Sequence, residues 1–313
     1  MQTQSPTPDT PLRIGTRGSA LALAQAHETR DRLMAAHGLP EAAFEIVVIK
    51  TTGDRVLDRA LSEIGGKGLF TKEIEEALLD GSIAIAVHSM KDMPTVLPDG
   101  LAMAAYLPRE DVRDAFVSHR HESLAALPSG AVVGSSSLRR RAQLLNRRPD
   151  LQVVEFRGNV QTRMKKLADG VAEATFLACA GLRRLGMEAE IRSAIAVEEM
   201  LPAVAQGAIG IEARADDAAA RSLLAPIACA DTAARLAAER AFLAGLDGSC
   251  RTPIGGLATL EGGEVLLRGE IIRPDGSERH ATERRGTVAD AAALGADAAE
   301  ELRARGGEGF FTV

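Results

Sequence analysis

The stretch IAIAVHSMKDMP, residues 83–94, passes from apolar residues into polar ones that are suited to chemistry. Residues 83–87 are nearly all apolar and predict a strand buried on both faces of a parallel sheet. Ligands of open α/β sheets usually bind at the carboxyl ends of such strands. The residues expected there are His88, Ser89, Lys91 and Asp92. The adjacent charges of Lys91 and Asp92 favour each other's ionised forms. A solvated strand end with a surface ion pair is the alternative.

Arginines follow several predicted strands where the chain turns into a helix. Arg17 lies in the loop GTRGS, in which Ser19 is placed to cap a helix that Gly38 ends. Arg157 and Gly158 precede a helix that carries Arg163. An arginine beside the free N–H groups of a helix start resembles an anion pocket. An exposed loop arginine is the alternative at each place.

The segment GSSSLRRR, residues 134–141, concentrates this pattern. Cations in the first turn of a helix oppose the helix dipole. Three hydroxyls, free backbone N–H groups and clustered arginines at one helix start therefore call for an anion. An exposed basic face is the alternative. The cost of misplaced charge favours the anion.

A single cysteine lies in the glycine-rich loop GSCRTPIGG, residues 248–256. Cys250 beside Arg251 is expected to be exposed and to have a lowered pKa, which makes it a better nucleophile. A stray loop thiol is the alternative. Cys179 follows an apolar run and is expected to be a buried packing thiol. Three cysteines do not indicate a disulfide framework, so we expect reduced thiols and a cytoplasmic protein.

Composition limits the remaining possibilities. The 313 residues include no Trp and one Tyr, which disfavours stacking platforms for single-stranded nucleic acid. A formal net charge of −6 disfavours a general polyanion binder. No apolar run is long enough to span a bilayer, and the sequence contains no evident P-loop or cluster of metal ligands. Residues 1–11 are polar and Pro-rich, which predicts a disordered lead-in and no signal peptide.

The elements that must position these residues form an α/β pattern. Strands are expected over residues 12–14, 44–50, 83–87, 131–133, 153–156 and 175–178, with helices between them. Residues 51–70, with four glycines and Lys67, predict a long mobile loop in which Lys67 can reach a ligand. Gln206 lies in a loop before another strand. After a helix over residues 231–246, the chain predicts a three-stranded antiparallel meander and a final helix over residues 289–305.

Six motifs in the same order resemble the hydroxymethylbilane synthase family, also called porphobilinogen deaminase. They are IGGKGLF, HSMKDMP, GSSSLRRRAQL, FRGNVQTRMKKL, LPAVAQGAIGIE and GSCRTPIGG. The resemblance runs from about Leu12 to the C-terminus. It implies an α/β fold of two periplasmic-binding-protein-like lobes around a cleft, plus a small α+β C-terminal domain with a three-stranded antiparallel sheet.

The same resemblance implies domain boundaries and an activity. The first lobe would comprise residues 12–108 and 203–226, the second lobe 109–202, and the C-terminal domain 227–313. The implied reaction joins four porphobilinogen molecules head to tail with loss of ammonia, and then releases hydroxymethylbilane by hydrolysis. A dipyrromethane cofactor, attached to Cys250 through a thioether, would serve as primer. Porphobilinogen and oligopyrrole intermediates are the implied partners, the protein would be a monomer, and nucleic acid and membrane are not expected.

Site residues are implied motif by motif. Cofactor-binding residues would be Cys250, Lys91, Ser89, Ser135, Ser136, Ser137, Arg139 and Arg140. Substrate-binding residues would be Arg17, Ser19, Lys67, Arg157, Gly158, Arg163 and Gln206. Asp92 would be catalytic, because a fixed carboxylate stabilises the cationic azafulvene left by loss of ammonia and assists proton transfer. The arginines would hold the acetate and propionate groups bidentately. No metal is implied.

Two positions depart from the family pattern. Glu63 stands where some members have lysine, which puts a second ammonium from that loop in doubt. Ser135 stands where a threonine often leads the hydroxyl trio, and it keeps the hydroxyl. Two other classes of function compete with the synthase. A bilobal protein that binds an anionic small molecule without catalysis does not account for the Cys250 loop. A nucleic-acid binder using residues 139–141 conflicts with the acidic charge balance.

Overall fold

A computed structural model describes residues 5–55, 71–248 and 252–312 of the chain. Its contacts divide the chain into two compact units. Unit 1 comprises Met1–Arg109 and Ala208–Ala233, and unit 2 comprises Glu110–Gly207 and Ala234–Val313. Unit 1 is therefore interrupted in sequence by part of unit 2.

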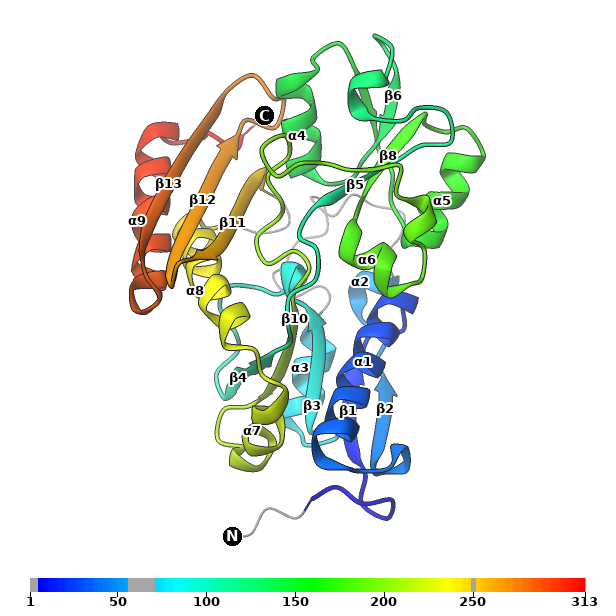
Figure 1. Cartoon of the computed structure of the whole chain (residues 1–313), viewed down its shortest axis with the longest axis vertical. Helices are drawn as coiled ribbons and strands as arrows, with labels where there is room; N and C mark the ends of the chain where they lie inside the picture. The colour runs from blue at the N-terminus through cyan, green and yellow to red at the C-terminus, as the bar shows by residue number, and fades with distance from the viewer. Residues whose placement is uncertain (1–4, 56–70, 249–251, 313) are drawn as a thin grey trace. The chain divides into compact units, whose positions relative to one another are not determined.

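Unit 1 is built on a five-stranded sheet with the order β2-β1-β3-β10-β4 (Figure 1). Its strands are β1 (Leu12–Thr16), β2 (Phe44–Val48), β3 (Ile85–Ser89), β4 (Leu101–Tyr106) and β10 (Ile209–Arg214). β1 is parallel to β2 and β3, whereas β10 is antiparallel to β3 and β4. The helices are α1 (Ala20–His37), α2 (Thr52–Arg55), α3 (Lys72–Leu79) and α7 (Ala218–Leu224).

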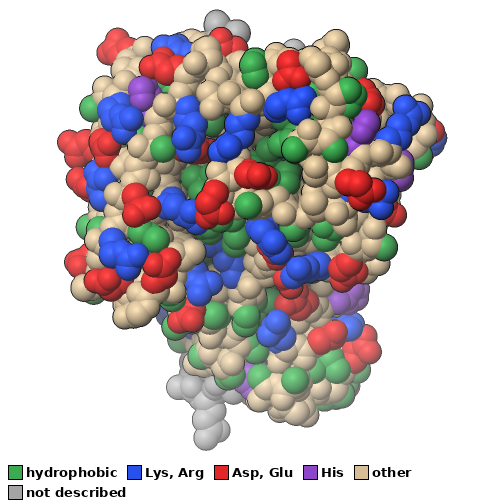
Figure 2. All heavy atoms as spheres, turned by 45° about the horizontal axis from the view of Figure 1, so that its top comes forward, with side chains coloured by type: hydrophobic (Ala, Val, Ile, Leu, Met, Phe, Trp, Pro, Cys, Tyr) green, Lys and Arg blue, Asp and Glu red, His purple; other side chains and the backbone are tan. Residues whose placement is uncertain are grey.

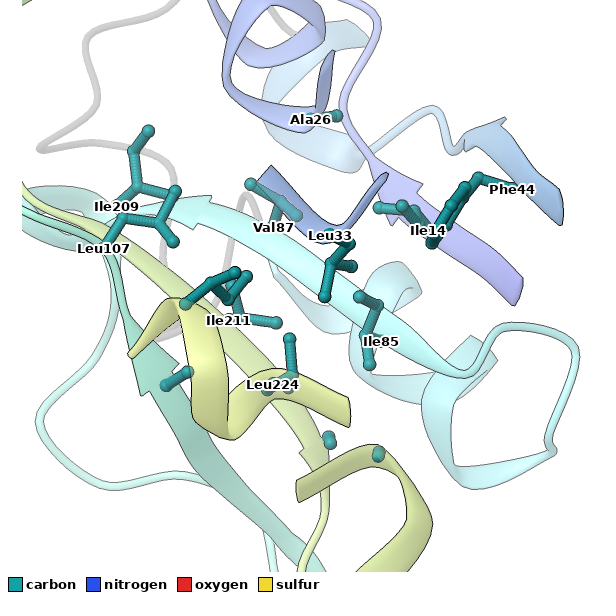
Figure 3. Packing of buried hydrophobic residues seen from close by; sticks show 14 of the residues in the cluster. Ile14, Ala26, Leu33, Phe44, Ile85, Val87, Leu107, Ile209, Ile211 and Leu224 are labelled. Atoms are coloured by element: carbon teal, nitrogen blue, oxygen red, sulfur yellow. The ribbon is translucent and has the colours of Figure 1, made fainter. Parts of the chain in front are cut away.

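Alternate residues of this sheet enter separate cores. Ile85 and Val87 join the cluster that includes Leu33 of α1 and Leu224 of α7 (Figure 3). Ala86, between them in the strand, belongs instead to the cluster of α3. β3 is thus covered on both faces, as its continuous apolar run predicts. Each fully buried large apolar side chain contributes about 1.5–3 kcal/mol.

Unit 2 contains a second five-stranded sheet, with the order β7-β6-β8-β5-β9. The strands are β5 (Asp114–Val117), β6 (Val132–Gly134), β7 (Gln152–Val154), β8 (Ala174–Ala178) and β9 (Ser193–Ala194). β6 is parallel to β7 and β8, and β5 is antiparallel to β8 and β9. Both sheets therefore use the same order of parallel and antiparallel strands. The helices of this sheet are α4 (Leu138–Arg147), α5 (Val160–Ala168) and α6 (Cys179–Arg184).

The end of the chain forms an antiparallel sheet with a helix. Helix α8 (Ala230–Gly245) precedes β11 (Ile254–Glu261), β12 (Glu264–Ile272) and β13 (Arg279–Thr287), and α9 (Ala291–Gly306) packs on β12 and β13 (Figure 1). The three strands pair as a meander in chain order. The predicted fold class, two α/β sheets and a small α+β part with a three-stranded antiparallel sheet, is confirmed.

The predicted ends of α1 are correct, because helix caps are determined by residues close in sequence. The Ser19 hydroxyl accepts a hydrogen bond from the Ala22 N–H at 3.2 Å, and Gly38 ends α1 with φ 63°. The strand predicted at 83–87 instead runs over Ile85–Ser89, because β10 pairs with its polar end. Strands β4 and β5 were missed. β4 pairs only with distant β10 among the described strands, and β5 begins with a charged residue, Asp114.

Candidate functional site

The predicted catalytic carboxylate lies beside a small cavity of unit 1, which we call the Asp92 cavity. It is found where β1 and β3 end and α1 and α3 begin, which is the usual ligand position in an open α/β sheet. Its polar lining comprises Arg17, Ser19, Gln25, Thr71, His88, Ser89 and Asp92. Four residues that the sequence singled out for substrate, cofactor or catalysis are thus brought together: Arg17, Ser19, Ser89 and Asp92.

A short 3₁₀ helix, Met90–Asp92, presents Lys91 and Asp92 after β3. Met90 is buried and donates its N–H to the Ala208 carbonyl at 3.0 Å. A Cβ at Gly210 would overlap the Met90 sulfur, so a larger residue at that position of β10 would displace the methionine side chain. The buried methionine anchors the turn, while Asp92 remains exposed at the cavity.

The hydroxyls of the cavity are held by the fold. Ser19 accepts from the backbone as the cap of α1, so its own O–H can still donate to a ligand. Ser89 donates its hydroxyl to Gln25 Oε1 at 2.9 Å. Gln25 comes from α1, so the helix and the strand fix the same corner of the cavity.

A buried acid–base cluster lies next to this cavity. His88 Nε2 is 3.0 Å from Glu212 Oε2, with the two side chains 5% and 0% exposed. Glu75 of α3 is also buried. Burial raises the pKa of Glu75, and the Glu212 carboxylate adds to the rise, while Thr71 and His88 oppose it. The sequence interpretation named His88 at the strand end but assigned it no role.

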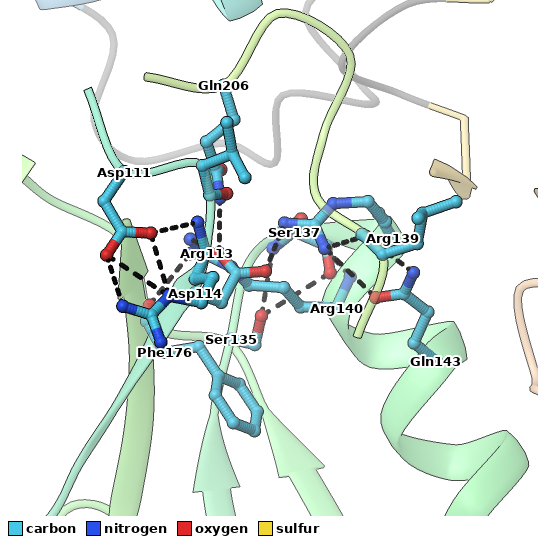
Figure 4. Close-up of polar contacts among 12 residues, drawn as sticks. Asp111, Arg113, Asp114, Ser135, Ser137, Arg139, Arg140, Gln143, Phe176 and Gln206 are labelled. Carbon is cyan, nitrogen blue, oxygen red and sulfur yellow. Dashed lines mark hydrogen bonds and ion pairs between the residues drawn. The ribbon is translucent and has the colours of Figure 1, made fainter. Parts of the chain in front are cut away.

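The arginines of α4 in unit 2 surround an aspartate that the sequence interpretation missed. We call Asp114, Arg139 and Arg140 the arginine cluster (Figure 4). Arg139 Nη2 lies 2.8 Å from Asp114 Oδ2, and Arg140 Nη2 lies 2.6 Å from Asp114 Oδ1. All three side chains are buried. The sequence predicts an anion at this helix start, and the Asp114 carboxylate is one such anion.

Electrostatics agree with this geometry. Burial by itself raises the pKa of Asp114, but the charges of Arg139 and Arg140 outweigh it and hold the pKa below its usual range. One carboxylate between two guanidinium groups leaves the arginine cluster with one net positive charge. Further carboxylates are thus favoured near it.

Neighbouring amides complete the arginine cluster. The Gln206 amide donates to Asp114 Oδ1 at 3.0 Å and to the Val112 carbonyl at 2.8 Å. The Gln143 oxygen accepts from Arg139 Nη1 at 3.0 Å, and its amide nitrogen donates to Glu270 of β12. Glu270 and Gln143 line a cavity of about 350 Å³ between α4, β12 and β13. Gln206 was predicted to bind substrate, which stays a prediction, and in this structure its amide contacts Asp114.

The three serines before α4 shape the loop that carries these arginines. Ser135 accepts from the Ser137 N–H at 3.2 Å, and Ser136 accepts from the Phe156 N–H at 2.9 Å. Ser137 caps α4 by accepting from the Arg140 N–H at 3.4 Å. The Ser136 and Ser137 hydroxyls are used as acceptors in these contacts, so their O–H groups remain suited to donate to an anion, whereas the Ser135 hydroxyl also donates to the Ser137 carbonyl at 3.5 Å.

The loop after β7 presents the next predicted arginines. Gly158 has φ 117°, and a Cβ there would contact Thr162, so the turn requires glycine. Arg163 Nε donates to the Gly158 carbonyl at 2.9 Å. Lys166 Nζ donates to the Arg157 carbonyl at 3.1 Å. Cationic side chains of the following helix thus hold the loop through hydrogen bonds to its carbonyl groups.

Two predicted residues, Cys250 and Lys67, lie outside the described residues, as does Glu63. Cys179 is buried, as predicted, and burial raises the pKa of its thiol to about 11. The described residues include no group of three or more His, Cys, Asp or Glu side chains able to hold a metal ion. In the same part of the chain, no helix has both the length and the apolar character needed to cross a membrane.

The residues present fit a cofactor that carries several carboxylates. Arg139 Nε and Arg157 Nη1 are buried nitrogens for which the described residues provide no hydrogen-bond partner. A buried donor without a partner costs about 1–3 kcal/mol, which a ligand oxygen would recover. The fold defines a two-lobed α/β protein, and its buried guanidinium groups have the charge and the donors that suit a polycarboxylate.

Comparisons with known proteins give the family. The model for "Porphobilinogen deaminase, dipyromethane cofactor binding domain" matches residues 12–222, and that for "Porphobilinogen deaminase, C-terminal domain" matches residues 233–304. The porphobilinogen deaminase of Paracoccus denitrificans (strain Pd 1222) is 71% identical over 309 residues, covering 99% of each chain. That of Nitrobacter hamburgensis is 58% identical over 300 residues, covering 96% of this chain and 95% of the relative.

The chain belongs to the porphobilinogen deaminase family. It is a transferase of porphyrin and heme biosynthesis with hydroxymethylbilane synthase function, and it contains a dipyrromethane cofactor-binding domain. The predictions of family, reaction and cofactor are confirmed. Among solved structures, a periplasmic substrate-binding protein of an ABC transporter from Coxiella burnetii has a TM-score of 0.43 and 13% identity, covering 69% of this chain and 91% of that chain.

Proposed function

We propose that Asp92 is the catalytic carboxylate of the synthase and that the Asp92 cavity receives porphobilinogen. The observation that carries this proposal is the grouping of Asp92 with Arg17, Ser19 and Ser89 around one cavity. Arg17 and Ser19 supply a guanidinium and a hydroxyl for the substrate carboxylates. Asp92 stabilises the positive charge that develops on the pyrrole when ammonia leaves.

The remaining substrate-binding residues belong to the same proposal. Arg157, Gly158 and Arg163 form a loop whose buried Nη1 of Arg157 suits a carboxylate oxygen. Gln206 would act through its contact with Asp114. Lys67 is proposed from its motif alone, because it lies outside the described residues.

We assign the cofactor to a second set of residues. Arg139, Arg140 and the hydroxyls of Ser135, Ser136 and Ser137 would hold its carboxylates, together with Lys91 and Ser89. Cys250 would carry it through a thioether. When bound, the dipyrromethane supplies a primer on which the chain of rings grows. The support is the net positive charge of the arginine cluster and the buried Arg139 Nε.

Asp92→Asn tests the catalytic assignment. It removes the charge with little change in shape, so turnover should fall about 10²–10³-fold while the folded state and the cofactor mass remain. Asp99→Asn changes an exposed carboxylate seven residues further on and is the matched control. Steady-state turnover and intact mass are the measurements. Turnover of Asp92→Asn within a few-fold of the parent would refute the assignment.

Intact mass also tests the anchor. The purified parent and Cys229→Ser should each carry the added mass of two linked pyrroles, and Cys250→Ser should not. Parent protein without the adduct would be incubated with hydroxymethylbilane first. An adduct that persists in Cys250→Ser would show that another residue is the attachment point.

The remaining assignments concern organisation. We propose three domains with the boundaries 12–108 with 203–226, 109–202 and 227–313, after a lead-in of residues 1–11. We also propose a cytoplasmic monomer that binds neither nucleic acid nor membrane. On the face shown in Figure 2, basic and acidic side chains are interspersed, so this face carries charges of both signs. Sedimentation equilibrium and a salt series of DNA-binding measurements test these points.

A further inference from the structure

His88 and Glu212 form a buried pair on one face of the unit 1 sheet. In the antiparallel pairing of β3 and β10, His88 is opposite Gly210 and Glu212 is opposite Ala86. His88 and Glu212 are therefore diagonal neighbours on the same face, 3.0 Å apart between Nε2 and Oε2. Ala86 on that face packs with α3, the helix that carries Glu75.

The pair reaches the Asp92 cavity through the histidine. His88 lines the cavity together with Arg17, Ser19, Ser89 and Asp92. Glu212, by contrast, is fully buried behind it. The charged and titratable groups around the imidazole are thus Glu212 from β10, Glu75 from α3, and Arg17 and Asp92 across the cavity.

A carboxylate hydrogen-bonded to one ring nitrogen of a histidine determines the tautomer and favours protonation of the other nitrogen. An ionised Glu212 can only accept, so it selects the tautomer in which Nε2–H donates to it and Nδ1 carries the free lone pair of the neutral ring. The carboxylate also stabilises the imidazolium formed when Nδ1 takes up a proton. Burying a carboxylate costs free energy, which is offset when the carboxylate pairs with a histidine. A role in orienting that histidine as a base would account for a buried glutamate at this position.

We propose that His88 is a further catalytic residue, whose Nδ1 accepts the proton released when each new ring is joined, and that Glu212 is its positioning residue. The proposal rests on the function proposed for the Asp92 cavity. It gives the two groups separate tasks. Asp92 stabilises positive charge, and His88 holds the proton.

The proton balance of ring coupling requires such a base. The C–N bond of the protonated aminomethyl group breaks, and its electron pair leaves with the nitrogen as ammonia. The methylene carbon then bonds to the α-carbon of the accepting pyrrole. The C–H bond at that carbon breaks, its electrons restore the aromatic ring, and the proton passes to His88 Nδ1. The imidazolium gives the proton to ammonia, which leaves as ammonium. An imidazole, which can both accept a proton and give it up, suits this exchange.

His88→Gln separates catalysis from structure. The glutamine amide can still donate to Glu212, but it cannot accept a proton. We expect turnover to fall at least about 10²-fold, with loss of the limb of the pH–rate profile due to imidazole ionisation. Cofactor mass after incubation with hydroxymethylbilane should equal that of the parent. Turnover and pH profile like those of the parent would overturn the proposal.

A second histidine–glutamate pair provides the matched control. His121 Nε2 lies 3.0 Å from Glu173 Oε2 in unit 2, with side chains 20% and 30% exposed. His121→Gln should leave turnover and the pH profile unchanged. An equal loss in both variants would mean that the effect is not specific to the cavity, and would overturn the proposal.

The tautomer can be read in the parent protein, even where a variant fails to fold. In ¹⁵N-histidine-labelled holoenzyme, neutral His88 should show a protonated Nε2 and a bare Nδ1. Glu212→Gln should reduce the population of that tautomer. A protonated Nδ1 in the neutral ring would overturn the proposal. Arg17→Gln tests the cavity separately, because an unchanged KM there refutes the substrate site whatever His88 does.

Discussion

Asp114 Oδ1 lies 2.6 Å from Arg140 Nη2, and the two side chains are 0% and 6% exposed. Arg139 contacts the other oxygen of the same carboxylate. The basic helix start of α4 thus has its counter-ion in Asp114, the first residue of β5. The carboxylates proposed to bind there would meet arginines that are already oriented, so little side-chain entropy would be lost on binding.

Asp114→Asn should destabilise unit 2 by about 3–5 kcal/mol, because it leaves two buried guanidinium groups without their carboxylate. The pKa of Asp114 is lowered in the folded state, so its contribution is complete above the unfolded pKa of about 3.9. It is lost as the pH falls below that value. Urea unfolding of parent and variant at pH 7 and pH 3 measures both effects.

Asp150→Asn is the control for that experiment. Asp150 pairs with Arg148 at 2.8 Å on the surface, so its loss should matter far less than the loss of Asp114. Equal destabilisation by the two variants would contradict the importance assigned to the buried carboxylate.

Glu75→Gln should stabilise the protein at alkaline pH. The pKa of Glu75 is raised in the folded state, so parent stability declines as the pH rises from the unfolded pKa of about 4.3 through the folded pKa. The variant lacks this decline. Its Tm should match the parent near pH 4 and exceed it at pH 8. Glu76→Gln, on the exposed side of α3, should show no such trend, and a Tm difference for Glu75→Gln that is independent of pH would contradict the expectation.

Gly207→Ala should lower the free energy of unfolding by more than the backbone strain of a positive φ alone. Gly207 has φ 84°, and its Cβ would lie 2.6 Å from the Glu110 carbonyl oxygen. Gly170 has φ 76° with no atom within 4 Å, so Gly170→Ala isolates the backbone cost of about 1 kcal/mol. The difference between the destabilisations caused by the two variants measures the cost of the clash between the new Cβ and the Glu110 carbonyl oxygen. A difference near zero would mean that the backbone moves to avoid this clash at little cost. Because Gln206 adjoins Gly207, turnover should fall with stability.

The Cys179 thiol should resist alkylation in the native protein. It is buried, and burial raises its pKa to about 11, so little thiolate exists at pH 8. Iodoacetamide labelling followed by peptide mass spectrometry should find Cys179 modified only after unfolding. Labelling in the native state as rapid as in urea would contradict this.

Local features of this fold were predictable from short stretches of sequence. Ser19 and Gly38 delimit α1 because caps act within a few residues. Asp114 was not predictable in this way, since its partners Arg140 and Gln206 lie 26 and 92 residues away. The signal available was an arginine-rich helix start that needed an anion, and that need was assigned to a ligand alone.

The site shows the same division. The motif ending in Asp92 indicated a functional strand end because an apolar run stops abruptly in polar residues. The contact of Glu212 with His88 depends on the pairing of β3 with β10, which no local pattern reveals. Sequence thus identified groups at single strand ends, whereas the partners that orient them come from strands and loops far along the chain.

The strand order of unit 1 has a consequence for synthesis on the ribosome. β10 pairs with both β3 and β4, yet 102 residues separate Tyr106, the end of β4, from Ile209, the start of β10. At about 5–20 residues per second, translation needs roughly 5–20 s to cross that interval. During this time β3 and β4 have been synthesised, but β10, which lies between them in the sheet, has not. The sheet that carries Asp92 is therefore completed only after the inserted sheet of β5 to β9 has been made, and the growing polypeptide must keep an open edge from aggregating until then.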